Sequence, residues 1–149
     1  MSRNGYKSDM SIDERVMMAI VRVAERFKKE QSAILKSYGF SFPQYNVLRV
    51  LDASKDGRNT IKDVNQIMLV SGANMTGITK RLEKMGCIVR STDANDERLK
   101  WLGITEKGKQ FLISVANEQE QGLRRYLKSY SNEEKSEMLK ILRGILHSE

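Results

Sequence analysis

The sequence has few of the residues that build covalent or metal-held structure. In 149 residues it contains one cysteine, Cys87, one proline, Pro43, and one histidine, His147. A lone cysteine excludes an intrachain disulfide framework, and one cysteine with one histidine makes a poor metal-ligand set. It also lacks any run of about 18 apolar residues, and its start, MSRNGYKSDM, has no signal-peptide core. We therefore expect a cytoplasmic protein without a membrane partner.

The groupings that mark enzymes are also missing. No nucleophile has a neighbouring base, and no phosphate-binding glycine loop is present. We therefore expect neither an enzyme nor a cofactor. What is present is positive charge, a formal net +7. A basic balance favours an anionic partner, of which nucleic acid is the commonest. The excess is spread along the chain, so charge alone is a weak indication.

The scarcity of proline permits long helices, and the first is predicted over residues 11–38. Ser11 and Glu14 form a capping box, and Gly39 is a natural stop. Its apolar residues recur at spacings of three and four, as in an amphipathic helix: Ile12, Val16, Ile20, Val23 and Phe27. A second helix opens with Ser41 as its cap and Pro43 in its first turn. The following KDGRN is expected to be a loop.

The middle of the chain changes to shorter elements. Thr60 caps a short helix over IKDVNQIM, and a further helix is predicted from about Gly72 to Met85. Two possible strands, CIVRS and LKWLGI, then flank the charged segment TDANDER. Two short helices followed by a hairpin form the winged helix-turn-helix pattern, in which the second helix enters the DNA major groove and the hairpin is the wing.

Helices return in the last third of the chain. Thr105 caps one long helix, and Ser131 with Glu134 forms a capping box for the last. Four residues of the last helix are expected to face inward: Met138, Leu142, Ile145 and Leu146. The predicted fold class is mainly α with a small β-hairpin wing (α+β). Its predicted parts are dimerisation helices at 1–40 and 105–149 and a winged helix-turn-helix domain at 41–104.

The outward face of the 72–85 helix suits DNA. Small residues let the backbone approach, hydroxyl and amide groups reach base edges, and cations meet phosphates. The candidate contacts are Ser71, Ala73, Asn74, Thr76, Gly77, Lys80, Arg81 and Lys84. Gly77 costs about 1 kcal/mol against alanine inside a helix, and a close backbone approach would be a reason to keep it. The alternative is an ordinary helix start followed by a solvated cationic face.

The hairpin tip offers a second contact. Arg98 is the candidate for the narrow minor groove, where negative potential is focused. Asp96 could hold its guanidinium, and Arg90 and Lys100 flank the tip within reach of phosphates. The alternative is a solvated hairpin with incidental ion pairs.

These residues in this order resemble the MarR family of bacterial transcription regulators. The resemblance rests on MTGITKRLEKMGCIVRSTDANDERLKWLGITEKGKQF, above all on Asp96-Glu97-Arg98 followed by LGITEKG. It implies a homodimer joined by the terminal helices, Arg98 in the minor groove positioned by Asp96, and usually repression of a promoter. A helix over 11–38, about 42 Å long, also carries more apolar surface than a small domain can cover.

The resemblance further implies a small-molecule effector, often an aromatic acid, between the dimer helices and the winged domain. Our candidates for its pocket are Phe40, Tyr45 and Met68, with ordinary core residues as the alternative reading. Cys87 is expected to be a small buried hydrophobe, with redox sensing as the alternative. The expected partners are thus double-stranded DNA, a second copy of the chain and an effector. Two other readings stay open: a winged-helix protein-interaction module and a non-specific basic DNA-binding protein.

Overall fold

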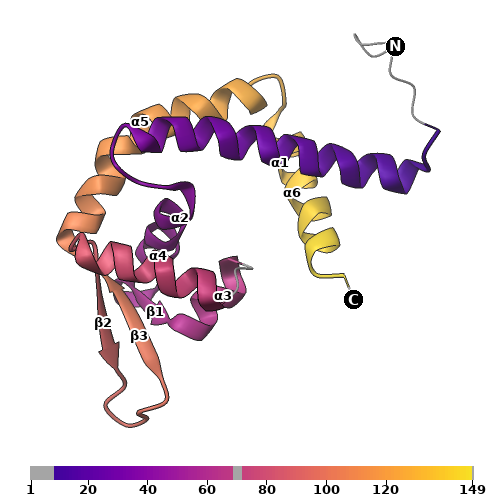
Figure 1. Cartoon of the computed structure of the whole chain (residues 1–149). Coiled ribbons are helices and arrows are strands. Elements are labelled where there is room, and N and C mark those ends of the chain that lie inside the picture. Colours follow the sequence, from indigo (N-terminus) through magenta and orange to yellow (C-terminus); the bar gives the residue numbers. More distant parts are fainter. Residues whose placement is uncertain (1–8, 69–71, 149) are drawn as a thin grey trace.

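A computed structural model describes residues 9–68 and 72–148 of the chain. Six α-helices, a short 3-10 helix and a small sheet make up these residues (Figure 1). In chain order they are α1 (Ile12–Lys36), α2 (Phe42–Asp52), η1 (Lys55–Gly57), β1 (Arg58–Thr60), α3 (Ile61–Met68), α4 (Gly72–Lys84), β2 (Ile88–Thr92), β3 (Lys100–Ile104), α5 (Glu106–Leu127) and α6 (Asn132–Leu146). The mainly α fold with a β wing is thereby confirmed. None of these helices is long and apolar enough to cross a membrane.

The predicted helix starts are confirmed at the level of single hydrogen bonds. The Ser11 hydroxyl accepts from the N–H of Glu14, which is one half of the predicted capping box, and Thr105 Oγ1 accepts from the N–H of Gly108. Ser41 and Ser131 both form complete capping boxes, in which the residue three positions on also bonds back to the cap. These caps satisfy N–H groups that a helix start leaves without a partner, so they fix where α1, α2, α5 and α6 begin.

Helices α1 and α5 run side by side along one side of the molecule, and α4 and the wing lie on the other side (Figure 1). Two short hydrogen bonds hold α5 to α1 and to the turn that follows α1. Tyr38 donates to Glu118 at 2.6 Å, and Tyr126 donates to Glu30 at 2.6 Å. The core lies around α2. It contains residues of the predicted terminal helices as well as residues of the predicted winged helix-turn-helix domain. Its buried apolar residues are Leu35, Val47, Leu48, Leu51, Val64, Met75, Leu82, Cys87, Ile88, Leu102, Phe111, Leu112 and Val115.

The wing is a three-stranded antiparallel sheet in the order β1-β3-β2. Thr60 pairs with Trp101 between β1 and β3, and Arg90 pairs with Leu102 between β2 and β3. The prediction that KDGRN is only a loop was wrong, because it ends in the first residues of β1. A strand of three residues has no alternation to reveal it in the sequence. It forms because β3 offers it a free edge.

The apolar stripe of the last helix does not face the chain's own core, contrary to the prediction. None of the described residues of α6 is buried, and Leu142 and Leu146 are 40% and 58% exposed. The N-terminal half of α1 is similar, with Ile12 66% exposed, and it projects beyond the rest of the chain (Figure 1). Spacing showed that these residues share a face, but it could not show what that face meets.

The start of α5 lies tightly against the root of the wing at Gly108. A β-carbon there would lie 2.5 Å from the carbonyl oxygen of Cys87 and 2.8 Å from a side-chain carbon of Ile104. The Cys87 oxygen belongs to the backbone and already accepts the N–H of Thr105 at 3.0 Å, so it has little freedom to move. Only glycine allows this approach of helix to strand.

We expect Gly108→Ala to lower the free energy of unfolding by at least about 1–3 kcal/mol, the usual cost of an overpacked core. Urea denaturation followed by circular dichroism measures this change. Gly144→Ala in α6 is the matched control, since no atom lies within 4 Å of the new β-carbon. The control should be neutral or stabilising, by up to about 1 kcal/mol. Equal stability of the two variants would show that α5 does not need this close contact.

Candidate nucleic-acid interface

Helix α4 presents a cationic, partly polar face to solvent. Asn74, Thr76, Gly77, Lys80, Arg81 and Lys84 are exposed there, as predicted. Met75 and Leu82 are buried beneath them and Ile78 and Met85 partly so, which fixes this face outward. Ser71 lies outside the described residues, and so does the side chain of Ala73. The exposed side chains combine hydrogen-bonding groups in the first turns with cations in the later ones, the mixture that major-groove helices use.

The wing tip holds Arg98 away from the protein surface. Its side chain is 93% exposed, whereas that of Asp96 is 44% exposed. Asp96 Oδ1 accepts from Arg98 Nε at 3.2 Å and from the N–H of Arg98 at 3.0 Å. One carboxylate oxygen therefore holds both the backbone and the side chain of the arginine. The guanidinium keeps its terminal N–H groups pointing outward, where a groove could receive them.

Asp93 holds the tip turn together from inside. Its Oδ1 accepts the N–H groups of Asn95 and Asp96, at 2.9 and 3.1 Å. Its Oδ2 accepts from the indole of Trp101 at 3.0 Å. The guanidinium of Arg58 in turn stacks on the Trp101 ring, 4.2 Å from its centre. A line of contacts thus runs from β1 to the tip, and sequence reasoning missed it because its members are far apart in the chain.

The carboxyl pKa of Asp93 is held below its ordinary value of 3.8, first by the N–H of Asn95 and then by Trp101. A lowered carboxyl pKa adds stability above the unfolded value, and that stability is lost as pH falls through the folded value. We therefore expect the tip to loosen below about pH 4. Fluorescence of Trp101, the one tryptophan, measures this. Asp93→Asn should abolish the acid transition; an unchanged transition would place its origin elsewhere.

The two cations that flank the tip have partners within the protein. Arg90 Nη2 donates to Thr79 Oγ1 at 3.0 Å, and Lys100 Nζ donates to Thr92 Oγ1 at 3.1 Å. Arg90 is therefore directed toward α4, while Lys100 lies across the hairpin. Thr79 did not stand out in the sequence. Its only signal was a polar residue at a position that faces inward with Met75 and Leu82.

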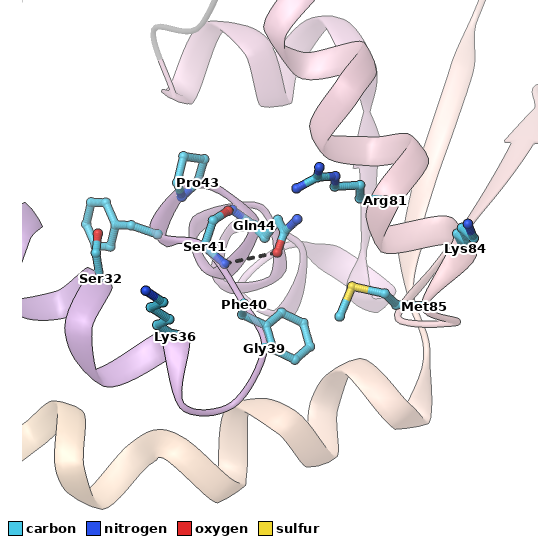
Figure 2. Close-up of a pocket in the computed structure, with 11 residues that line it drawn as sticks. Ser32, Lys36, Gly39, Phe40, Ser41, Pro43, Gln44, Arg81, Lys84 and Met85 are labelled. Atoms are coloured by element: carbon cyan, nitrogen blue, oxygen red, sulfur yellow. Dashed lines mark hydrogen bonds between the residues drawn. The ribbon is translucent and has the colours of Figure 1, made fainter.

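An open cavity of about 700 Å³ lies between the end of α1, the start of α2 and the end of α4. Of the three residues predicted for an effector pocket, Phe40 lines this cavity, whereas Tyr45 and Met68 do not line it and are packed partly buried against the core. Three cations border the cavity, Lys36 from α1 and Arg81 and Lys84 from α4. Figure 2 shows Lys36 and Arg81 on different sides of it, with Phe40 between α1 and α2. Lys36 was not foreseen, since only the fold brings it near α4.

Cys87 is fully buried, as expected of a small hydrophobe, and burial raises the pKa of its thiol. A raised pKa lowers the thiolate fraction on which reaction with oxidants depends. Among the residues that the structure describes, no three His, Cys, Asp or Glu side chains gather as metal ligands would.

Comparison with known proteins points to one family. Residues 38–99, which contain α2, α3, α4, β2 and the wing tip, match the model described as the MarR family. Over this part the chain is similar to the MarR family. One curated relative is the transcriptional regulator TtmR of Methylorubrum extorquens, 29% identical over 73% of this chain and 55% of the relative. The chain spans between about half and three fifths of the length of the first such relatives.

Solved structures, among them MarR-family regulators, share the fold over nearly the whole chain. Sco3205 of Streptomyces coelicolor, solved in complex with DNA, superposes with a TM-score of 0.82 at 18% identity, covering 95% of this chain and 91% of that one. BpsR of Bordetella bronchiseptica, whose DNA binding is regulated by 6-hydroxynicotinic acid, gives a TM-score of 0.80 at 18% identity, covering 95% and 100%. At these identities the likeness concerns the fold.

Proposed function

We propose that this chain is a MarR-family, sequence-specific DNA-binding transcriptional regulator that acts as a homodimer on a pseudo-palindromic site. The observation that carries the proposal is the pairing of two features, the exposed face of α4 and the outward Arg98 at the wing tip. Helix α4 and the β2–β3 hairpin lie next to each other, on the side of the molecule away from α1 (Figure 1). A helix for the major groove and an arginine for the adjacent minor groove give both base readout and register. By the resemblance to its family, the regulator represses by covering a promoter.

The dimer in this proposal rests on the unpartnered apolar face of the terminal helices. Exposed large apolar side chains cluster on α1 and α6, and such patches mark association sites in soluble proteins. They are Ile12, Val16, Met17, Met18, Val21, Val23, Met138, Leu139, Ile141, Leu142 and Leu146. A two-fold partner would cover both helices at once and place two α4 helices about one DNA turn apart.

The test is selection of duplex DNA from a random-sequence pool, followed by fluorescence anisotropy of the selected fragment with excess unrelated DNA. We expect a two-fold sequence motif and binding that survives the competitor. Recovery of no motif, with binding that competitor removes, would support a non-specific basic protein instead. Absence of DNA retention at low salt would favour a protein-interaction module.

We further propose that an anionic aromatic molecule, such as an aromatic carboxylate, binds in the cavity and releases the DNA. Lys36, Arg81 and Lys84 supply positive charge there, and Phe40 and Phe42 supply apolar surface. Arg81 and Lys84 also belong to the face that α4 offers to phosphates. An occupant that holds these two cations competes with DNA for them, which gives the negative coupling an effector needs.

Calorimetry with a panel of aromatic carboxylates tests the effector site. Lys36→Gln is the informative variant, because Lys36 lies on α1 and outside the α4 face. It should weaken ligand binding while leaving DNA affinity unchanged. Carboxylates that bind the variant as tightly as wild type, or that bind without displacing DNA, would contradict the proposal.

Gly77 provides a test of the DNA-facing side of α4. No atom lies within 4 Å of a β-carbon built there, so the free protein has room for alanine. Gly77→Ala should raise the free energy of unfolding by up to about 1 kcal/mol, because alanine is the better helix former. It should nevertheless weaken binding of the selected fragment, since the methyl group would stand between backbone and DNA. A variant that gains stability with unchanged DNA affinity would show that the glycine is not needed for close approach.

A further inference from the structure

A hydrogen-bonded side-chain link joins the recognition helix to the wing. Thr79 lies on the inner side of α4 and is 1% exposed. Its hydroxyl donates to the carbonyl oxygen of Thr76 at 3.2 Å and accepts from Arg90 Nη2 at 3.0 Å. The hydroxyl therefore uses both of its roles, one toward the exposed start of α4 and one toward strand β2.

The geometry points to Arg90 and Thr79 as a positioning pair, which sets the angle between wing and recognition helix and thereby the operator affinity. This inference rests on the proposed DNA-binding function, and it assigns Arg90 a role other than a simple phosphate contact. Two surfaces must fit one duplex at once, the α4 face in one groove and Arg98 in the next. A link between them restricts the motion of the wing relative to α4 already in the free protein. DNA binding then loses less conformational entropy.

The position of Arg90 supports this role. It is the central residue of β2 and is paired with Leu102 of β3, whose side chain is buried in the core. Arg98 lies at the far end of the same hairpin. A small rotation of β2 about the α4 contact is therefore carried to the tip as a larger displacement. A guanidinium that bonds a nearly inaccessible hydroxyl is held in direction, whereas one that only meets phosphate would be free to move in the unbound protein.

Thr79→Val is the deciding substitution, because it removes the acceptor of Arg90 without changing any charge. Thr79→Ser keeps the hydroxyl and is its matched control. With the fragment that wild type selects from a random pool, we expect Thr79→Val to lower affinity about tenfold and Thr79→Ser to leave it near wild type. The slope of log affinity against log salt should stay unchanged in both, since no phosphate contact is lost.

A double-mutant cycle with Arg90→Gln adds a second criterion. If the pair acts as a unit, the double variant binds no more weakly than Arg90→Gln alone. A readout without DNA accompanies it: amide hydrogen exchange over residues 91–93 should become faster in Thr79→Val and not in Thr79→Ser. Equal unfolding free energies of these two variants, within error, would exclude general destabilisation as the cause.

The outcomes separate the inference from the function beneath it. If wild type holds its fragment against competitor and Thr79→Val does so equally well, Arg90 and Thr79 do not position the wing. The losses of binding free energy in Thr79→Val and Arg90→Gln could instead add up in the double variant, with a lower salt slope for Arg90→Gln. That result would mean that Arg90 contacts a phosphate and does not act through Thr79. If wild type itself shows no specific binding, the proposed function fails, and this inference fails with it.

Discussion

Leu142→Glu is expected to convert the protein to monomers and to lower operator affinity by at least about a hundredfold. Leu142 lies on the α6 face that carries Met138 and Leu146, and it is exposed in the single chain. A two-fold interface meets each substitution twice, so two carboxylates would enter the same apolar contact. Burying a carboxylate without a partner costs several kcal/mol. Two of them together approach the roughly 8–12 kcal/mol that holds a micromolar to nanomolar dimer.

The loss of DNA affinity follows because a monomer contacts one half of the operator, whereas the proposed dimer contacts both halves. Two linked half-sites bind more tightly than one by a factor of about 10² to 10⁴, without any change in the contacts of either half. Sedimentation velocity measures the assembly and fluorescence anisotropy the affinity. Ser136→Glu is the control, since it adds the same charge to α6 at an exposed position off the apolar face. Dimers that persist in Leu142→Glu at micromolar concentration would place the interface elsewhere.

Arg98→Ala should cost about 1–3 kcal/mol for each wing, and about twice that for a dimer with both wings engaged. The arginine side chain is 93% exposed and is hydrogen-bonded to Asp96, so we expect its removal to leave the fold intact and to affect binding alone. The salt slope should fall by about one for each wing if the guanidinium meets phosphates as well as bases.

Two neighbouring variants sharpen this result. Asp96→Asn keeps the size of the side chain but weakens the bond to Arg98 Nε, so it should cost less than Arg98→Ala and leave the salt slope intact. Glu97→Ala removes an exposed negative charge beside the arginine and should tighten binding. Both effects are measured with the selected fragment over a range of salt. Equal affinity of wild type and Arg98→Ala would mean that the wing does not touch DNA.

The sequence predicted best what depends on neighbours along the chain. Capping residues such as Ser41 and Ser131 form hydrogen bonds with residues three positions on, so a stretch of four residues is enough to predict the interaction. The exposed face of α4 was predictable for the same reason, since a helix turns by a fixed angle and Met75 and Leu82 mark its inner side.

The features that the sequence did not predict depend on contacts between segments that are distant in the chain. Strand β1 exists because β3 lies beside it, and the Trp101 contact with Arg58 crosses the same sheet. Arg90 looked like a phosphate contact because its charge was visible while its partner Thr79, eleven residues earlier, was not. The cavity also depends on contacts between distant segments, since Lys36 and Arg81 line it together only once the chain has folded.

The tight junction at Gly108 has a mechanical consequence. Thr105 donates to the Gly86 carbonyl at 2.6 Å, and its N–H donates to that of Cys87, so α5 and the wing root move as one body. Helix α5 has 22 residues and is therefore a lever about 33 Å long. A tilt of about 10° at one end displaces the other by about 6 Å, more than one base-pair step of about 3.4 Å. In the proposed dimer, a slight change at the subunit interface would thus shift each wing by more than one base pair, enough to take it out of register with the groove that it is proposed to enter.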